Sequence, residues 1–457
     1  MALQFEEGDA ALRQALINNP RNLMATYIAD YKDCLLLLFN GDKKDFDQLH
    51  HHLDQRLELI ERGDKNTPWY RLCKGGLYMH WAFVHLRMGD NFKAATTFRK
   101  SFIILKENQR LYPSFEYDDI FFGLENAVVG TIPDDYKWIA SFLGMKGNVK
   151  KGVEQIERFL DRHTPQDAMY AEAQIFYAYL KFYLLSQQDE AWQYVNSNGF
   201  SISNNLLFGF VRANIALNYR KADAALQTLK HMQGLDDYKR FPVLDYEVGA
   251  ALLHKLEPAA IGYFNRFLSA YRGKLFIKDT WQKKAYAYYL QGDEQQALQC
   301  KEAIKRYGTT DVDADKQAQR FAEQNVWPQT LLLQARLLID GGYYQQALTK
   351  LSGKTEADMG GITDKAEYNF RLGRAYDELG NDSKALEYYN RAISLGRERK
   401  EHFAARSSLQ VGFIYEKRGN AALALASYKA CLGMPVQDYK NSIFQQAKAG
   451  INRLTVK

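Results

Sequence analysis

Apolar residues recur at i, i+3, i+4 and i+7 along almost the whole chain, which is the spacing of one face of an α-helix. We find no convincing run of the strict apolar–polar alternation that marks a half-buried strand. Helix breakers are scarce, since the 457 residues include only 9 prolines and 31 glycines, and the prolines fall at the ends of the apolar segments. The pattern therefore predicts an all-α protein.

Two segments near the C-terminus repeat one arrangement of small and aromatic residues at an interval of 39 residues. Small side chains let two helix backbones approach closely where they cross, and the rings fill the wedge beside that contact. A Gly-Asn pair follows the first expected helix of each segment, because glycine tolerates the left-handed conformation that ends a helix. The matching positions are Gly373 and Gly412, Tyr376 and Tyr415, Ala385 and Ala424, and Tyr389 and Tyr428.

This arrangement, Leu372-Gly373-x-x-Tyr376 followed by Ala385 and Tyr389, resembles the tetratricopeptide repeat (TPR) pattern of Leu-Gly-x-x-Tyr and Ala-x-x-x-Phe. Weaker copies lie upstream. The resemblance implies an all-α, right-handed superhelical solenoid of TPR-like helical hairpins, of which we expect about 11 to 12 from the chain length and the repeat period.

Four regions follow from the repeats. Residues 1–62 are expected to form N-terminal helical hairpins, the first of them incomplete, because Gly8 to Pro20 fits the second helix of a repeat. Residues 63–307 hold divergent TPR-like repeats, 308–327 form a polar linker or kink, and 328–457 hold the C-terminal TPR repeats. An incomplete first hairpin indicates either a trimmed chain or an unpaired helix that caps the solenoid.

Segment 117–160 combines several glycines with one proline. Its spacing resembles a segment of the Iml2-like TPR family and of uncharacterised bacterial cell-envelope TPR proteins. The residues that carry this resemblance are Phe122, Gly123, Gly130, Pro133, Trp138, Gly144, Gly147 and Gly152.

No stretch of the sequence reaches the roughly 18 apolar residues of a membrane-spanning helix, and no signal peptide opens it. Removal of a leader would explain the incomplete first hairpin, so we expect the periplasm or cell envelope rather than the cytoplasm. The sequence leaves the compartment and the oligomeric state open.

Charge and motifs argue against several functions. The 60 basic and 54 acidic residues give a net charge of +6 without a clustered basic face, so we expect no nucleic-acid partner. The sequence has no P-loop, Gly-x-Ser-x-Gly or Gly-x-Gly-x-x-Gly motif. We therefore expect neither an enzyme nor a bound cofactor.

Three groups of residues invite other chemistry. The consecutive His50, His51 and His52 point about 100° apart on a helix, which favours a solvated face over a metal site. Paired aspartates at 118–119 and 134–135 could serve a hydrolase, but acids are also favoured at helix starts. The cysteines at 34, 73, 300 and 431 are expected as buried thiols, and whether Cys34 and Cys73 pair is left open.

The resemblance implies a non-catalytic scaffold that binds a peptide or protein partner in its concave groove, which the first helix of each hairpin lines. The alternative is a cell-envelope protein that binds a small ligand, glycan or lipid. Phe370 and Arg374 stand at the positions of the chaperone-type carboxylate clamp, so binding of that kind is not expected. Counting from the packing residues, the groove candidates are Asn214, Asn218, Tyr246, Tyr286, Tyr289, Arg336, Arg374, Asp377, Phe413 and Lys417.

Overall fold

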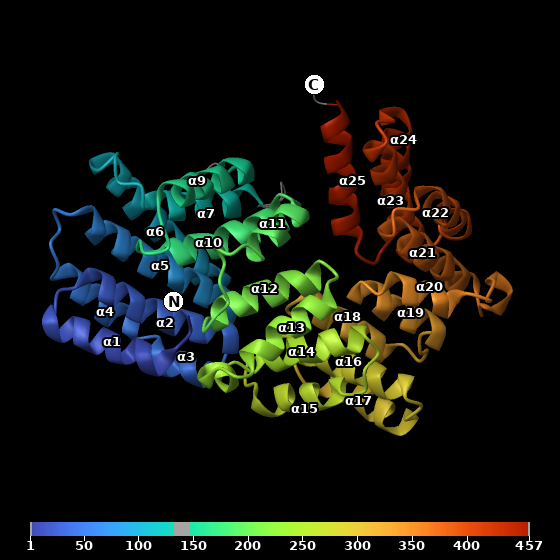
Figure 1. The fold of residues 1–457 in the computed structure, drawn as a ribbon, viewed down its shortest axis with the longest axis horizontal. Helices are drawn as coiled ribbons and strands as arrows, with labels where there is room; N and C mark the ends of the chain where they lie inside the picture. The colour runs from blue at the N-terminus through green and yellow to red at the C-terminus, as the bar shows by residue number, and fades with distance from the viewer. Residues whose placement is uncertain (1, 132–146, 456–457) are drawn as a thin grey trace. The chain divides into compact units, whose positions relative to one another are not determined.

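The computed structural model describes residues 2–131 and 147–455, and these residues are predominantly helical with no strand among them. The described chain divides into two compact units (Figure 1). The first unit comprises residues 1–250, 259–284 and 300–320, and the second comprises 251–258, 285–299 and 321–457. The predicted all-α fold is confirmed.

The first unit is built from consecutive helices that pack on their neighbours in the chain. Its helices are α1 (Phe5–Asn18), α2 (Leu23–Asn40), α3 (Lys43–Leu49), α4 (His52–Glu61), α5 (Pro68–Met88), α6 (Asn91–Leu111), α7 (Asp118–Gly130), α9 (Val149–Arg162), α10 (Tyr170–Tyr179), α11 (Gln188–Val195), α12 (Leu206–Asn218), α13 (Ala222–Met232) and α15 (Ala260–Ala270). Four more helices contribute residues to both units: α14 (Val243–His254), α16 (Ile277–Leu290), α17 (Glu294–Arg306) and α18 (Asp313–Glu323).

The second unit contains the helices with the clearest repeats. They are α19 (Thr330–Gly341), α20 (Tyr344–Leu351), α21 (Ile362–Glu378), α22 (Asp382–Gly396), α23 (Phe403–Lys417), α24 (Ala421–Leu432) and α25 (Lys440–Thr455). Each of these helices contacts the next one in the chain, so that α21 with α22 and α23 with α24 form stacked hairpins (Figure 1).

The predicted small-residue contacts hold these hairpins together. A Cβ added to Gly373 would lie 2.6 Å from Cδ1 of Tyr389, and one added to Gly412 would lie 2.5 Å from Cδ1 of Tyr428. Both rings are fully buried. Only glycine lets the first helix approach the ring of the second so closely, which confirms the packing inferred from the sequence.

The Gly-Asn pairs make the turns between the two helices of a hairpin. Gly380 and Gly419 have φ values of +76° and +72° and follow the ends of α21 and α23. The next residue, Asn381 or Asn420, accepts a hydrogen bond from a backbone N–H in the first turn of α22 or α24. One dipeptide therefore ends the first helix and caps the second.

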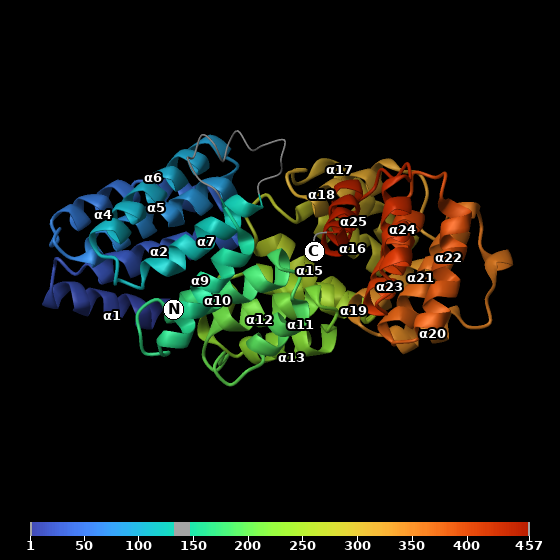
Figure 2. The same cartoon turned by 90° about the horizontal axis from the view of Figure 1, so that it is seen from above.

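Helices α2, α4, α5 and α6 pack together in the first unit, where they lie side by side in Figure 2. Glycines again allow close packing. A Cβ on Gly75 would lie 2.7 Å from Cγ of Leu105, and one on Gly76 would lie 2.5 Å from Cε2 of Tyr27. The first unit thus uses the same packing principle without the regular repeat.

Segment 117–160 forms parts of two crossing helices, α7 and α9. A Cβ on Gly123 would lie 2.6 Å from the carbonyl oxygen of Gly152, so the two backbones touch at these glycines. The Pro133, Asp134, Asp135, Trp138 and Gly144 positions lie outside the described residues.

Residues 308–327, expected as a polar linker or kink, include helix α18. The acidic Asp315 is fully buried there. Its carboxylate accepts hydrogen bonds from the backbone N–H of Phe276 at 2.7 Å and of Asp279 at 3.0 Å. Asp315, which in the sequence suggests a solvated linker, therefore accepts hydrogen bonds from free backbone N–H groups at the start of α16.

All four cysteines are buried and unbridged, so Cys34 and Cys73 do not pair. Within residues 2–131 and 147–455, we find no helix with the length and apolar character needed to cross a membrane.

Candidate functional site

Four arginines on the first helices of successive hairpins gather in the second unit, and we call them the arginine face. They are Arg336 on α19, Arg371 and Arg374 on α21, and Arg406 on α23. On α21, Glu367, Arg371, Arg374 and Glu378 follow one another at intervals of three or four residues, which places them along one side of the helix.

Local ion pairs fix two of these arginines. Nη2 of Arg371 lies 2.6 Å from Oε1 of Glu367, and Nη2 of Arg374 lies 2.8 Å from Oε1 of Glu378. Arg371 and Arg374 are both buried, whereas Arg336 and Arg406 are half-buried. The guanidinium of Arg336 lies 5.1 Å from the centre of the Tyr286 ring, within range of a cation–π interaction.

The pKa of His402 is shifted by burial and by the charges of this face. Burial lowers the pKa of His402, and the positive charges of Arg371, Arg406 and Arg336 lower it further, to about 3. The imidazole is therefore neutral at pH 7. Its ring lies 4.9 Å from that of Tyr439, whose side chain is 43% exposed. The arginine face thus combines guanidinium groups with the rings of His402 and Tyr439.

Three of the other groove candidates of the second unit contact neighbouring side chains of that unit. Tyr289 stacks on Trp327 with ring centres 4.6 Å apart. Asp377 accepts a hydrogen bond from the hydroxyl of Tyr389 at 3.0 Å. The Phe413 ring packs edge-on against that of Tyr428, and Lys417 is exposed.

Three candidates belong to the first unit. Asn214 donates a hydrogen bond to Oε1 of Glu247 at 2.8 Å. Asn218 donates to the carbonyl of Asn214, and Tyr246 donates to Oδ2 of Asp279 at 2.6 Å. Asn214 and Tyr246 therefore hold neighbouring helices together.

Arg371, His402, Arg406 and Tyr439 were missed in the sequence. Arg371 could have been found from its spacing to Arg374 on one helix face. The repeat gives no signal for Arg406, because the equivalent position 39 residues earlier is Glu367. His402 and Tyr439 stand outside the repeated pattern, and only folding brings them together.

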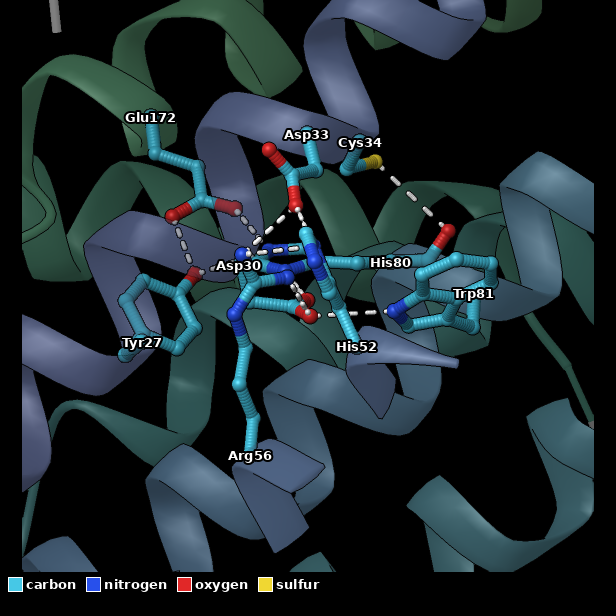
Figure 3. Close-up of polar contacts among 9 residues, drawn as sticks. All are labelled: Tyr27, Asp30, Asp33, Cys34, His52, Arg56, His80, Trp81 and Glu172. Carbon is cyan, nitrogen blue, oxygen red and sulfur yellow. Dashed lines mark hydrogen bonds and ion pairs between the residues drawn. The ribbon is translucent and has the colours of Figure 1, made fainter. Parts of the chain in front are cut away.

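A second concentration of charge lies in the first unit, and we call it the polar cluster (Figure 3). It consists of Tyr27, Asp30, Asp33, Cys34, His52, Arg56, His80, Trp81 and Glu172. Asp30 is its centre, because its fully buried carboxylate accepts hydrogen bonds from Nη1 of Arg56 at 3.0 Å and Nε1 of Trp81 at 3.0 Å. Nδ1 of His80 lies 2.8 Å from Oδ2 of the same carboxylate.

The polar cluster joins α2, α4, α5 and α10. Nη2 of Arg56 donates to Oδ2 of Asp33 at 2.6 Å, and Nδ1 of His52 lies 2.7 Å from the same oxygen. His52 is thus half-buried and bound to Asp33, whereas His50 and His51 are exposed as expected. No group of three or more His, Cys, Asp or Glu side chains within the described ranges is arranged to hold a metal ion.

His80 gives the first unit a predicted pH dependence. Burial lowers the pKa of His80, but the hydrogen bond to Asp30 and the charges of Asp30 and Glu172 outweigh burial and raise it overall. A raised pKa in the folded state stabilises the protein below the unfolded value of about 6.5. This contribution is lost as the pH rises through the folded pKa. We therefore expect the free energy of unfolding to fall more over this range in the unmodified protein than in His80→Gln.

Denaturant titrations between about pH 5 and 8 measure this difference, with the exposed His231→Gln as the control. Burial also raises the pKa values of Asp118 and Glu247 to about 7, so these groups titrate in all three proteins. Only the difference between variants isolates His80. Parallel curves for His80→Gln and the unmodified protein would contradict the assignment.

One tetratricopeptide-repeat match lies in the second unit. The family model described as tetratricopeptide repeat matches residues 366–398, which cover most of α21 and all of α22. No curated protein matches the sequence.

Two solved structures are similar over most of the chain, each at 13% identity. One is the crystal structure of the APC/C hetero-tetramer Cut9-Hcn1, with a TM-score of 0.30 and coverage of 99% of this chain and 94% of the other. The second is the P58(IPK) TPR domain, with a TM-score of 0.23 and coverage of 90% of this chain and 97% of the other. Neither similarity informs the function of this chain.

Proposed function

We propose that this protein is a non-catalytic interaction scaffold whose second unit binds an acidic peptide segment of a protein partner at the arginine face. TPR-like hairpins are typical of such scaffolds. The observation that carries the proposal is the gathering of Arg336, Arg371 and Arg406 around His402 from three successive first helices. Guanidinium groups bind carboxylates with two parallel hydrogen bonds.

We assign different roles to the buried and the half-buried arginines of this face. Arg371 and Arg374 are buried and paired with acids of their own helix, so they shape the face and are not assigned direct contact with the peptide. Arg336 and Arg406 are half-buried, and the neighbouring Tyr439 is exposed. Arginine and tyrosine are enriched among the residues that contribute most to protein interfaces. We therefore assign direct contact with the peptide to these three residues.

Tyr286, Phe413 and Lys417 are proposed as the flanks of this surface, whereas Tyr289 and Asp377 contact Trp327 and Tyr389. Phe413 and the exposed Lys417 belong to α23, and Tyr286 lies under Arg336. Asn214, Asn218 and Tyr246 are not included, because they belong to the first unit.

Fluorescence polarisation with labelled acidic, neutral and basic peptides tests the proposal. We expect the acidic peptides to bind, and we expect Arg336→Glu to weaken binding at least about tenfold because it reverses one contacting charge. Added salt should also weaken binding.

Arg391→Glu is the matched control. Arg391 is an exposed arginine on α22, the second helix of its hairpin, where it pairs with Glu356. Binding of acidic peptides that Arg391→Glu weakens as much as Arg336→Glu, or equal binding of all three peptide classes, would contradict the proposed surface.

A further inference from the structure

The first unit contains an apolar cavity of about 520 Å³. Side chains of α2, α5, α10 and α12 form most of its wall, together with residues near α14 and α15. Leu38, Phe83, Phe176, Phe210, Val243 and Phe276 represent the apolar lining. Asn214, Asn218 and Tyr246 do not line it.

The volume of this cavity is that of a binding site for a small molecule. Protein interiors are close-packed and contain few voids larger than a water molecule. Binding sites for small molecules measure about 300–1,000 Å³ and are predominantly apolar, with a few polar groups that orient the ligand. The cavity of the first unit fits that description in volume and in lining.

One polar group in the wall lacks a hydrogen-bond partner. Glu172 is fully buried and lines the cavity. Its Oε2 accepts a hydrogen bond from the hydroxyl of Tyr27 at 2.6 Å, whereas its Oε1 accepts no hydrogen bond and makes only the longer ion pair with His80 that is drawn in Figure 3. Nε2 of His80 lies 3.9 Å from Oε1, beyond hydrogen-bonding distance. A buried acceptor without a donor is costly, and a hydroxyl group inside the cavity would satisfy it.

A guanidinium group lies in another part of the wall. Arg87 follows His80 by seven residues on α5, which corresponds to about 10 Å along the helix. Its Nε donates to the carbonyl of Leu38 at 2.8 Å, and its Nη2 donates to the hydroxyl of Tyr271 at 2.6 Å. Both acceptors are neutral. A charge beside apolar side chains is stabilised best by an opposite charge, so a carboxylate fits this end.

We propose that the cavity binds an elongated apolar carboxylic acid that also carries a hydroxyl group, with the carboxylate at Arg87 and the hydroxyl donating to Oε1 of Glu172. This site belongs to the first unit, and the peptide surface proposed above belongs to the second. The apolar chain of the ligand occupies the space between the two polar ends.

Calorimetric titration with ω-hydroxydecanoic acid, decanoic acid and decanol tests the site. The hydroxy acid is expected to bind at one molecule per chain and more tightly than decanoic acid, because only the hydroxy acid satisfies both ends. Arg87→Met should weaken binding of both acids at least about tenfold and leave decanol unchanged. Equal weakening of the acids and the alcohol would overturn the role assigned to Arg87.

A second pair of variants tests whether binding occurs inside the cavity. Val243→Trp places a large ring in the lining and should abolish binding of all three compounds. Val326→Trp is the control, because Val326 is 73% exposed and belongs to the second unit. Absence of binding to the unmodified protein, or equal binding by the two tryptophan variants, would overturn the proposal. If Val243→Trp does not fold, the comparison of acids and alcohol in Arg87→Met decides.

Discussion

Replacing Asp30 by alanine is expected to destabilise the first unit by about 3–5 kcal/mol, because the change leaves buried polar groups without their shared acceptor. Arg56, His80 and Trp81 all direct nitrogen atoms at this carboxylate, and they come from α4 and α5 while Asp30 belongs to α2. Removing one partner from a buried charge network costs far more than breaking an exposed ion pair. The free energy of unfolding, from denaturant titration, measures the effect.

Asp47→Ala is the control for this experiment. Asp47 is an exposed aspartate on α3 that pairs with Lys43, so its loss should cost no more than about 1 kcal/mol. Asp30→Asn keeps the shape but removes the charge, and we expect a loss between those of the two alanine variants. Equal stability of Asp30→Ala and Asp47→Ala would show that the polar cluster does not hold α2 against α4 and α5.

Gly412→Ala is expected to destabilise the second unit by about 1–3 kcal/mol through overpacking. The added Cβ meets the ring of Tyr428, and this ring cannot move away. Gly450 of α25 lies against its other edge, where a Cβ would be 2.6 Å from Cζ. The hydroxyl of Tyr428 also donates to Glu416, which Arg453 holds at 2.8 Å.

Hydrogen exchange of peptides from α23 and α24 measures this change locally, and denaturant titration measures it globally. Gly262→Ala is the control, because Gly262 lies on the exposed side of α15 with no atom within 4 Å of an added Cβ. That change should be neutral or slightly stabilising, since alanine favours a helix over glycine. Unchanged protection of α23 and α24 in Gly412→Ala would contradict the clamped position of the ring.

The sequence predicted the packing of the second unit because small and aromatic residues there follow one period. Gly373 and Tyr389 meet as expected, and so do Gly412 and Tyr428. The groove candidates remain predictions. Asp377 accepts a hydrogen bond from the hydroxyl of Tyr389, and Tyr289 stacks on the ring of Trp327. Periodicity specifies which helix face a residue lies on but not which distant side chain covers it.

The first unit shows the same limit more strongly. No local pattern distinguishes Asp30 from the exposed acids of the chain, because its partners Arg56 and Trp81 lie 26 and 51 residues further on. Asp315 belongs to a polar segment that suggests a linker, yet it is buried and satisfies the backbone of α16. Burial of a polar group depends on donors supplied by other helices.

The sequence alone determined the helical fold and the hairpin contacts of the clearest repeats, since both depend on spacings within a few tens of residues. Only the tertiary structure decided that the arginines of three hairpins lie near His402, that Asp30 is the centre of a buried polar cluster and that the first unit contains an apolar cavity. Each of these features joins side chains from helices far apart in the chain. Their proximity follows from the angles at which the helices pack, and the spacing of apolar residues does not specify those angles.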